Sequence, residues 1–145
     1  MIPKIIHYCW LGDSEFPELV KKCIQSWKKK MPDWEFILWD KNCLKDLNSD
    51  WVNEAYSTKK YAFAADYIRL YAVNKFGGFY LDSDVEVLKN FAPLLDSPYI
   101  FALENEIGDI EAATFGSEPN NPYVQKCLSY YEGRHFIKKD NTYDT

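Results

Sequence analysis

The sequence predicts an α/β fold in which a mostly parallel sheet forms a single domain over residues 1–145. Two observations favour this fold. A strand, a helix and a second strand are predicted in order over residues 4–39, and consecutive strands joined by a helix form parallel pairs. A further apolar strand follows a long predicted helix and ends in two aspartates. The length fits one domain, since domains typically have about 100–200 residues.

The first strand is predicted over residues 4–9, in an apolar stretch rich in β-branched and aromatic side chains. Apolar residues at helical spacing follow. Pro17 suits the first turn of this predicted helix, and Pro32 stops it. The second strand is predicted over residues 35–39.

Residues 43–58 are expected to form short helical pieces and loops. Ser57 or Thr58 is expected to cap the next helix, because hydroxyl oxygens accept hydrogen bonds from helix N-termini. That helix is predicted over residues 59–75. It ends at Gly77-Gly78, because glycine adopts the left-handed conformation at little cost.

The third strand is predicted over residues 79–82. A last helix opens at Asn121-Pro122 and is predicted to reach about residue 131. The tail, residues 138–145, is polar and shows no core pattern. Three further extended segments are expected, over residues 85–88, 99–103 and 112–115.

The charge balance argues against nucleic-acid binding. The chain has 17 Lys and Arg against 22 Asp and Glu, a formal charge of −5, whereas nucleic-acid binding needs a basic surface. No apolar stretch reaches the ~18 residues of a transmembrane helix, and residues 1–30 lack the apolar region of a signal peptide. We therefore expect no transmembrane segment and a cytoplasmic protein, with peripheral attachment to a membrane left open.

The four cysteines contain no C-x-x-C pair, so a zinc site is not expected. Each lies among apolar residues, which indicates buried free thiols in a reducing compartment. The cysteines are Cys9, Cys23, Cys43 and Cys127.

Two aspartates spaced by one residue end the third predicted strand. In an extended chain, residues i and i+2 point to the same side, so Asp82 and Asp84 can face one ligand. Ligands of open α/β sheets bind at the carboxyl ends of the strands. Carboxylate oxygens there suit Mg²⁺ or Mn²⁺, with phosphate oxygens as further ligands. An ordinary turn built from Asp and Ser is the alternative.

Asp66 and Arg69 share one face of the predicted helix over residues 59–75. A simple ion pair between them is the plain interpretation. Their helix is otherwise largely apolar, and burying charge without polar partners is costly. A hydroxyl-rich or anionic ligand would supply those partners.

Trp10 lies at the end of the first predicted strand, at the same edge of the sheet. It is either a core residue or a stacking platform for a nucleobase. His7 is expected to be a hydrogen-bonded core histidine. Glu104 and Asn105, which follow an apolar stretch, are weaker candidates for the cleft.

Three motifs together resemble one family. They are Ile-Pro-Lys-Ile-Ile-His-Tyr-Cys-Trp-Leu-Gly at residues 2–12, Ala-Ala-Asp-Tyr-Ile-Arg at residues 64–69 and Gly-Gly-Phe-Tyr-Leu-Asp-Ser-Asp at residues 77–84. The chain resembles the DXD-containing sugar-transferase family, which includes capsular-polysaccharide and mannosyl transferases. That family is similar to the glucosylating domain of large clostridial toxins.

The resemblance implies a GT-A-like fold, a Mn²⁺ or Mg²⁺ ion and a UDP- or GDP-sugar donor. By position, Trp10 would stack on the base and Tyr80 would line the donor pocket. Asp66 and Arg69 would hold the donor sugar and its diphosphate. Asp82 would contact hydroxyl groups and the metal, and Asp84 would be the principal metal ligand.

The implied reaction is sugar transfer, with retained configuration, to a saccharide or lipid-linked saccharide in surface-glycan synthesis. No side chain is an evident nucleophile, so a front-face route without a covalent intermediate is expected. A metal bridging the two phosphates would stabilise the charge on the leaving diphosphate. Domains of the family usually continue further, so residues 1–145 are expected to be the N-terminal, donor-binding part.

Two alternatives remain open at this point. Leu81-Asp82-Ser83-Asp84-Val85 also resembles the nucleophile motif of haloacid-dehalogenase-type phosphatases. That motif, however, usually lies on the first strand and needs a later acidic pair. The other alternative is a non-catalytic domain that binds nucleotide sugars.

Overall fold

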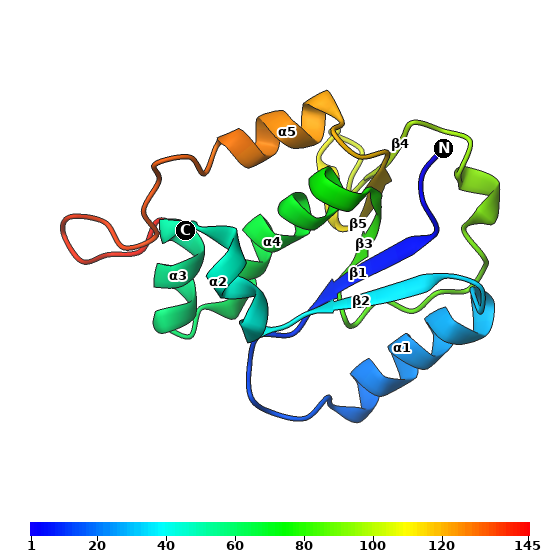
Figure 1. The fold of residues 1–145 in the computed structure, drawn as a ribbon, viewed down its shortest axis with the longest axis horizontal. Coiled ribbons are helices and arrows are strands. Elements are labelled where there is room, and N and C mark those ends of the chain that lie inside the picture. Colours follow the sequence, from blue (N-terminus) through cyan, green and yellow to red (C-terminus); the bar gives the residue numbers. More distant parts are fainter.

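A computed structural model describes all residues from Met1 to Thr145 and shows a five-stranded sheet with helices on both faces (Figure 1). The strands are β1 Ile5–Cys9, β2 Glu35–Trp39, β3 Gly78–Leu81, β4 Tyr99–Leu103 and β5 Ile110–Ser117. The helices are α1 Glu18–Lys30, α2 Leu44–Leu47, α3 Asp50–Ser57, α4 Tyr61–Phe76 and α5 Pro122–Ser129, with short 3₁₀ turns η1 Lys41–Cys43 and η2 Ala92–Leu94.

The strands lie in the order β2-β1-β3-β5-β4. β1 pairs in parallel with β2 and β3, whereas β5 pairs antiparallel with both β3 and β4. Strand β5 therefore runs against the other four. The α/β prediction is confirmed, and the sheet is mixed because of this one reversed strand.

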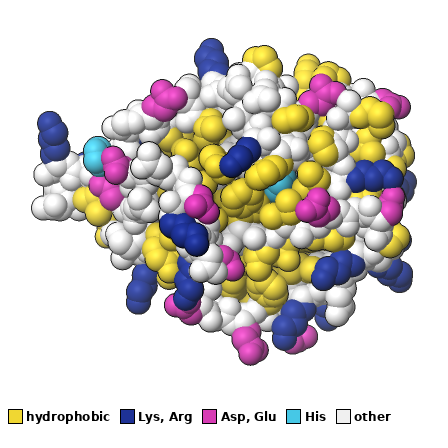
Figure 2. All heavy atoms as spheres, in the orientation of Figure 1, with side chains coloured by type: hydrophobic (Ala, Val, Ile, Leu, Met, Phe, Trp, Pro, Cys, Tyr) yellow, Lys and Arg dark blue, Asp and Glu magenta, His cyan; other side chains and the backbone are white.

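Side chains of β1 and β3 point alternately to the two faces of the sheet and pack into two separate hydrophobic cores, because side chains in a strand alternate with a period of two. Ile6 and Phe79 point toward α1, where Trp27 is fully buried. Cys9 and Tyr80 point the other way, toward α3, α4 and α5. On the face seen in Figure 2, hydrophobic side chains gather toward the middle and charged side chains of both signs surround them.

His7 of β1 is a fully buried, hydrogen-bonded histidine, as the sequence predicted. Its Nε2–H donates to the carbonyl of Gly77 at 2.8 Å, and its Nδ1 accepts from the indole N–H of Trp39 at 3.1 Å. The two partners fix the tautomer, because a carbonyl only accepts and an indole N–H only donates. Burial lowers the pKa of His7 to about 4, so the ring is neutral at pH 7.

Gly77 and Gly78 turn the chain from α4 into β3 with φ angles of 67° and 101°. A Cβ on Gly78 would lie 2.6 Å from the carbonyl oxygen of Ile5 in the neighbouring strand. The second glycine is therefore required by its backbone angle and by the close approach of β1.

Two local predictions were wrong. Ser57 and Thr58 do not cap α4, because they end α3, where both hydroxyls donate to the carbonyl of Glu54. Lys60 is the N-cap of α4, without a side-chain hydrogen bond. Residues 85–88 form no strand, although the indole N–H of Trp27 donates to the Val85 carbonyl at 2.7 Å.

The polar tail folds back on the domain more closely than its composition suggests. Tyr143 stacks on the fully buried Phe136, with ring centroids 5.2 Å apart. Glu54 of α3 accepts hydrogen bonds from the backbone N–H of Phe136 and from the ring of His135, both at 2.9 Å. A carboxylate of α3 thus holds the segment that leads into the tail.

The four cysteines are free thiols, two of them buried and two partly buried: Cys9 and Cys23, then Cys43 and Cys127. None of the helices combines the length and the apolar character that a membrane crossing needs.

We expect Gly78→Ala to lower the free energy of unfolding by about 2 kcal/mol or more, because a left-handed residue with a Cβ costs about 1–2 kcal/mol before the contact with Ile5 is counted. Urea unfolding measures this loss. Gly108→Ala is the matched control, since Gly108 has φ 99° and nothing within 4 Å of a Cβ. Equal losses in the two variants would show that the approach of β1 does not matter.

Stability should fall as the pH drops from 6.5 toward 4, because the unfolded chain protonates its histidine in this window and the native His7 does not. The full loss from this group is about 3 kcal/mol. Urea unfolding at pH 7 and pH 5 should show the fall in the wild type and in His135→Gln, and a smaller fall in His7→Gln. An unchanged pH dependence in His7→Gln would assign the effect to other groups.

Candidate functional site

The carboxyl ends of β1 and β3 meet at one edge of the sheet. The two strands pair in parallel, with Ile6 opposite Phe79 and His7 opposite Tyr80. Trp10 directly follows β1, and Asp82 directly follows β3. The strand pairing therefore places the first and third motifs of the sequence side by side.

A cleft of about 610 Å³ opens at this edge. Five of the six predicted site residues line it: Trp10, Arg69, Tyr80, Asp82 and Asp84. Asp66 does not, and lies instead at a second cavity that Arg69 also borders. The cleft is also lined by three residues that the sequence did not single out: Ser14, Tyr61 and Ser83.

Arg69 joins the helix, the sheet and the cleft. Its side chain is 11% exposed and donates to the carbonyl of Ala112 in β5 at 2.7 Å and to the carbonyl of Ala65 at 3.3 Å. It also forms ion pairs with Asp66 at 3.2 Å and Asp82 at 3.5 Å. The guanidinium lies 4.7 Å from the centre of the Tyr80 ring. Its donors are thus directed at several groups, as suits a planar fork of five N–H bonds.

The carboxylates beside Arg69 are partly desolvated. Burial raises the pKa of Asp66 and of Asp82, and the positive charge of Arg69 opposes both shifts. Asp84 and Glu111 add to the rise in the pKa of Asp82 because they repel its negative charge. The cleft therefore has an excess of negative charge that a cation would relieve.

Trp10 is held as a rigid wall of the cleft. Its indole N–H donates to the carbonyl of Ser14 at 2.9 Å, and Phe16 packs edge-on against it, with ring centroids 5.3 Å apart. The side chain is only partly buried. A fixed, partly open aromatic surface is suited to stacking against a flat ligand.

Asp82 and Asp84 belong to a turn that leaves β3, with the Val85 N–H donating to the Asp82 carbonyl at 3.0 Å. The two interpretations of this segment, an ordinary turn and a ligand site, are therefore compatible, because Asp82 and Asp84 form a turn and also line the cleft. No three metal-binding side chains gather in one place. Two carboxylates at an open edge fit a divalent ion that takes its other ligands from phosphate and water.

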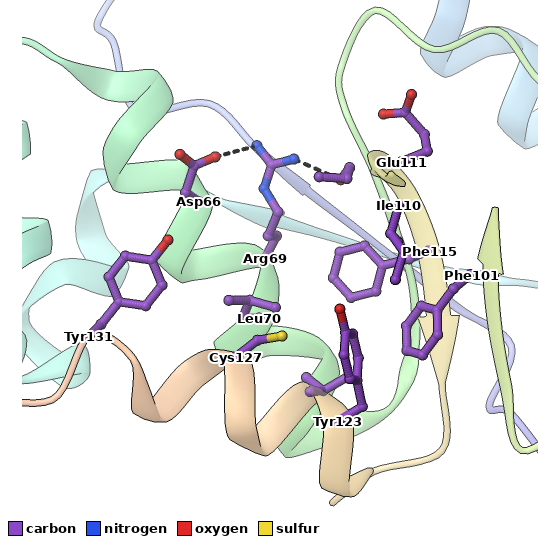
Figure 3. Close-up of a pocket in the computed structure, with 12 residues that line it drawn as sticks. Asp66, Arg69, Leu70, Phe101, Ile110, Glu111, Phe115, Tyr123, Cys127 and Tyr131 are labelled. Atoms are coloured by element: carbon purple, nitrogen blue, oxygen red, sulfur yellow. Dashed lines mark hydrogen bonds and ion pairs between the residues drawn. The ribbon is translucent and has the colours of Figure 1, made fainter. Parts of the chain in front are cut away.

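Figure 3 shows the second cavity: Asp66, Arg69 and the ring of Tyr131 lie on one side of it, and the rings of Phe101, Phe115 and Tyr123 lie on the other. Glu111 of β5 also borders it, and its carboxylate accepts from the Ala113 N–H at 2.7 Å. Sequence reasoning missed Glu111 because nothing local marks it. Glu104 and Asn105, the weaker candidates, lie in the exposed β4–β5 connection and line neither cavity.

Residues 17–101, more than half of the chain, match the model of a family described as "Glycosyltransferase sugar-binding region containing DXD motif". The chain belongs to this family. The family resemblance predicted from the three motifs is confirmed. Family membership also leaves the phosphatase alternative without support.

Named relatives include fungal mannosyltransferases. Inositol phosphoceramide mannosyltransferase 1 of Schizosaccharomyces pombe is 27% identical over 94% of this chain and 46% of its own length. Mannosyl phosphorylinositol ceramide synthase SUR1 of Saccharomyces cerevisiae is 29% identical over 94% of this chain and 37% of its own length. The chain thus spans less than half the length of these two relatives.

The fold is also seen in a solved structure, the PaToxG glycosyltransferase. It superimposes with a TM-score of 0.73 at 21% identity, covering 99% of this chain and 66% of that protein. The likeness confirms the predicted GT-A-like fold.

We expect Arg69→Lys to lower the free energy of unfolding by about 1–3 kcal/mol, since an ammonium group cannot reach the same set of buried partners. Chemical denaturation measures the change. Arg134→Lys is the matched control, because Arg134 is the other arginine and pairs with Asp144 near the surface. A loss no larger than that of the control would show that the buried contacts of Arg69 contribute little.

Proposed function

We propose that this chain carries the donor site of a metal-dependent, retaining glycosyltransferase that uses a UDP- or GDP-sugar. The main support is the convergence of Trp10, Arg69, Tyr80, Asp82 and Asp84 on one cleft at the carboxyl edge of the sheet. Family membership supports the class of reaction.

The cleft offers a suitable surface for each part of the donor. Trp10 stacks on the base, an interaction worth about 1–3 kcal/mol per base. Asp82 and Asp84 hold Mn²⁺ or Mg²⁺ at the diphosphate. When bound there, the ion acts as a Lewis acid toward the leaving nucleoside diphosphate.

The donor sugar lies against Arg69 and the carboxylates beside it. Asp82 accepts hydrogen bonds from hydroxyl groups on the side of the main cleft, and Asp66 does so on the far side of the guanidinium. Arg69 keeps both carboxylates in place and thereby orients the sugar for attack. Asp66 and Asp82 are both ion-paired with Arg69, so neither is a free nucleophile. This pairing favours the front-face route. A glycosyl adduct on Asp66 or Asp82, seen by mass spectrometry, would overturn that route.

We propose a saccharide or lipid-linked saccharide as the acceptor. Several relatives are named for mannosylation of inositol phosphoceramide, a lipid, so a lipid-linked acceptor and a place at the membrane surface agree with them.

Calorimetry with UDP, UDP-sugars, GDP and GDP-mannose tests the donor site, first with Mn²⁺ and then with a chelator. We expect binding with metal only, and to one base. Asp84→Asn should weaken nucleotide binding in Mn²⁺ by at least tenfold, because one of two protein ligands loses its charge. Trp10→Ala should weaken all nucleotides with the same base alike.

Asp96→Asn is the matched control for Asp84→Asn, because Asp96 is exposed and lines neither the cleft nor the second cavity. Unchanged affinity in Asp84→Asn would remove Asp84 from the metal site. Metal-dependent binding without transfer or hydrolysis would favour the non-catalytic alternative.

A further inference from the structure

The second cavity combines three charged side chains with apolar walls. The charged residues are Asp66, Arg69 and Glu111, and the other nine lining residues are hydrophobic, four of them aromatic. Its volume of about 350 Å³ is in the range of ligand pockets, which are mostly apolar with a few placed polar groups. A sugar ring matches this composition, because its hydroxyl groups lie around its edge and its C–H bonds give it apolar faces.

Glu111 lies at the rim of this cavity because β5 runs antiparallel to β3 (Figure 3). The N–H of Asp82, directly after β3, donates to the carbonyl of Ala113 at 2.8 Å, so the start of β5 lies beside the end of β3. The negative charge of Glu111 is close enough to raise the pKa of Asp82. The antiparallel pairing therefore brings a carboxylate of β5 to the edge of the sheet where the donor cleft opens.

The carboxylate of Glu111 is held in place but is not neutralised. One of its oxygens accepts a hydrogen bond from the N–H of Ala113 at 2.7 Å. The carboxylates of Asp66 and Asp82 are ion-paired with Arg69, whose guanidinium lies between the cleft and the cavity. Glu111 forms no ion pair. Its second oxygen can therefore accept from a ligand, and hydrogen bonds to an ionised acceptor are stronger than those to a neutral one.

The charge of the cavity restricts the kind of sugar that fits it. Two carboxylates and one guanidinium line the cavity, which gives it a net charge of −1. A uronic acid would add a further carboxylate and be repelled. An uncharged sugar would instead supply hydroxyl donors to carboxylates that can only accept.

We propose that Glu111 determines which donor sugar is bound: its carboxylate accepts hydrogen bonds from hydroxyl groups of an uncharged sugar that extends past Arg69 into the second cavity. Asp66 accepts from the same sugar on the opposite side (Figure 3), and the aromatic rings pack against its C–H faces. This assignment rests on the proposed function, because it takes the donor site as given.

The ratio between the affinities for a nucleotide sugar and for its nucleoside diphosphate tests this role. Calorimetry in Mn²⁺ compares GDP-mannose with GDP and UDP-glucose with UDP, and the pair that binds is used for the variants. We expect Glu111→Ala to lower this ratio about tenfold and to leave the affinity for the nucleoside diphosphate unchanged, because only the sugar reaches Glu111. Glu111→Gln should lower the ratio less, because its amide oxygen still accepts a hydrogen bond but carries no charge.

Glu106→Ala is the matched control, since Glu106 is exposed in the same β4–β5 connection and lines neither the cleft nor the second cavity. An unchanged ratio in Glu111→Ala, or an equal change in Glu106→Ala, would overturn the role of Glu111. Weaker binding of the nucleoside diphosphate itself in Glu111→Ala would assign Glu111 to the metal or the diphosphate and would also overturn it. Glu111→Gln carries the same test if Glu111→Ala unfolds.

The charge of the sugar provides an independent readout. A uronic-acid donor, UDP-glucuronate or GDP-mannuronate according to the base, should bind at least about tenfold more weakly than its neutral parent, because like charges repel. Glu111→Gln should reduce this difference several-fold, since it removes one of the two carboxylates of the cavity. A uronic-acid donor that binds as tightly as its neutral parent would contradict the proposal.

Binding of the nucleoside diphosphates separates this proposal from the proposed function. Metal-dependent nucleotide binding with an unchanged ratio in Glu111→Ala would overturn the role of Glu111 and leave the donor site intact. Absence of metal-dependent nucleotide binding in the wild type would overturn the proposed function, and the role of Glu111 with it.

Discussion

The buried guanidinium of Arg69 is the interaction on which this structure depends. A positive charge is costly inside a protein unless it is paired and hydrogen-bonded. Here the carbonyl of Ala112 and the carboxylates of Asp66 and Asp82 meet that requirement. The same contacts tie α4 to β5 and to the turn after β3. The group that stabilises the packing of the domain thus also arranges the carboxylates of its cleft.

Much of the fold follows from local sequence signals. The apolar alternation of β1, β2 and β3 and the glycine pair after α4 identified these elements within a residue or two. Asp82, Asp84 and Trp10 could be placed at one edge because parallel strands share the direction of their carboxyl ends. The capping of α4 could not be predicted, because Ser57 and Thr58 donate backward into α3, and either use of a hydroxyl fits the sequence.

The direction of β5 explains the other differences from the sequence-based expectation. Strand direction depends on pairing with a distant partner, so the sequence of β5 alone does not reveal it. Reversal brings Ala112 to the guanidinium and Glu111 to the rim of the second cavity. Asp66 then lies across Arg69 from the main cleft. The helical spacing of Asp66 and Arg69 predicted that they share a face of α4. It could not predict that the main cleft and the second cavity open on opposite sides of the Arg69 guanidinium, with Asp66 at the second cavity.

The reversed strand also divides the cleft region into parts that can change independently. The walls facing the aspartates come from the ends of β1 and β3, the segment that leads from β1 into α1, and α4, whereas much of the second cavity comes from the β4–β5 hairpin and α5. An exposed hairpin tolerates insertions and substitutions better than a central parallel strand. Descendants of this domain can therefore alter the β4–β5 hairpin over evolutionary time while the edge formed by β1 and β3 is inherited unchanged.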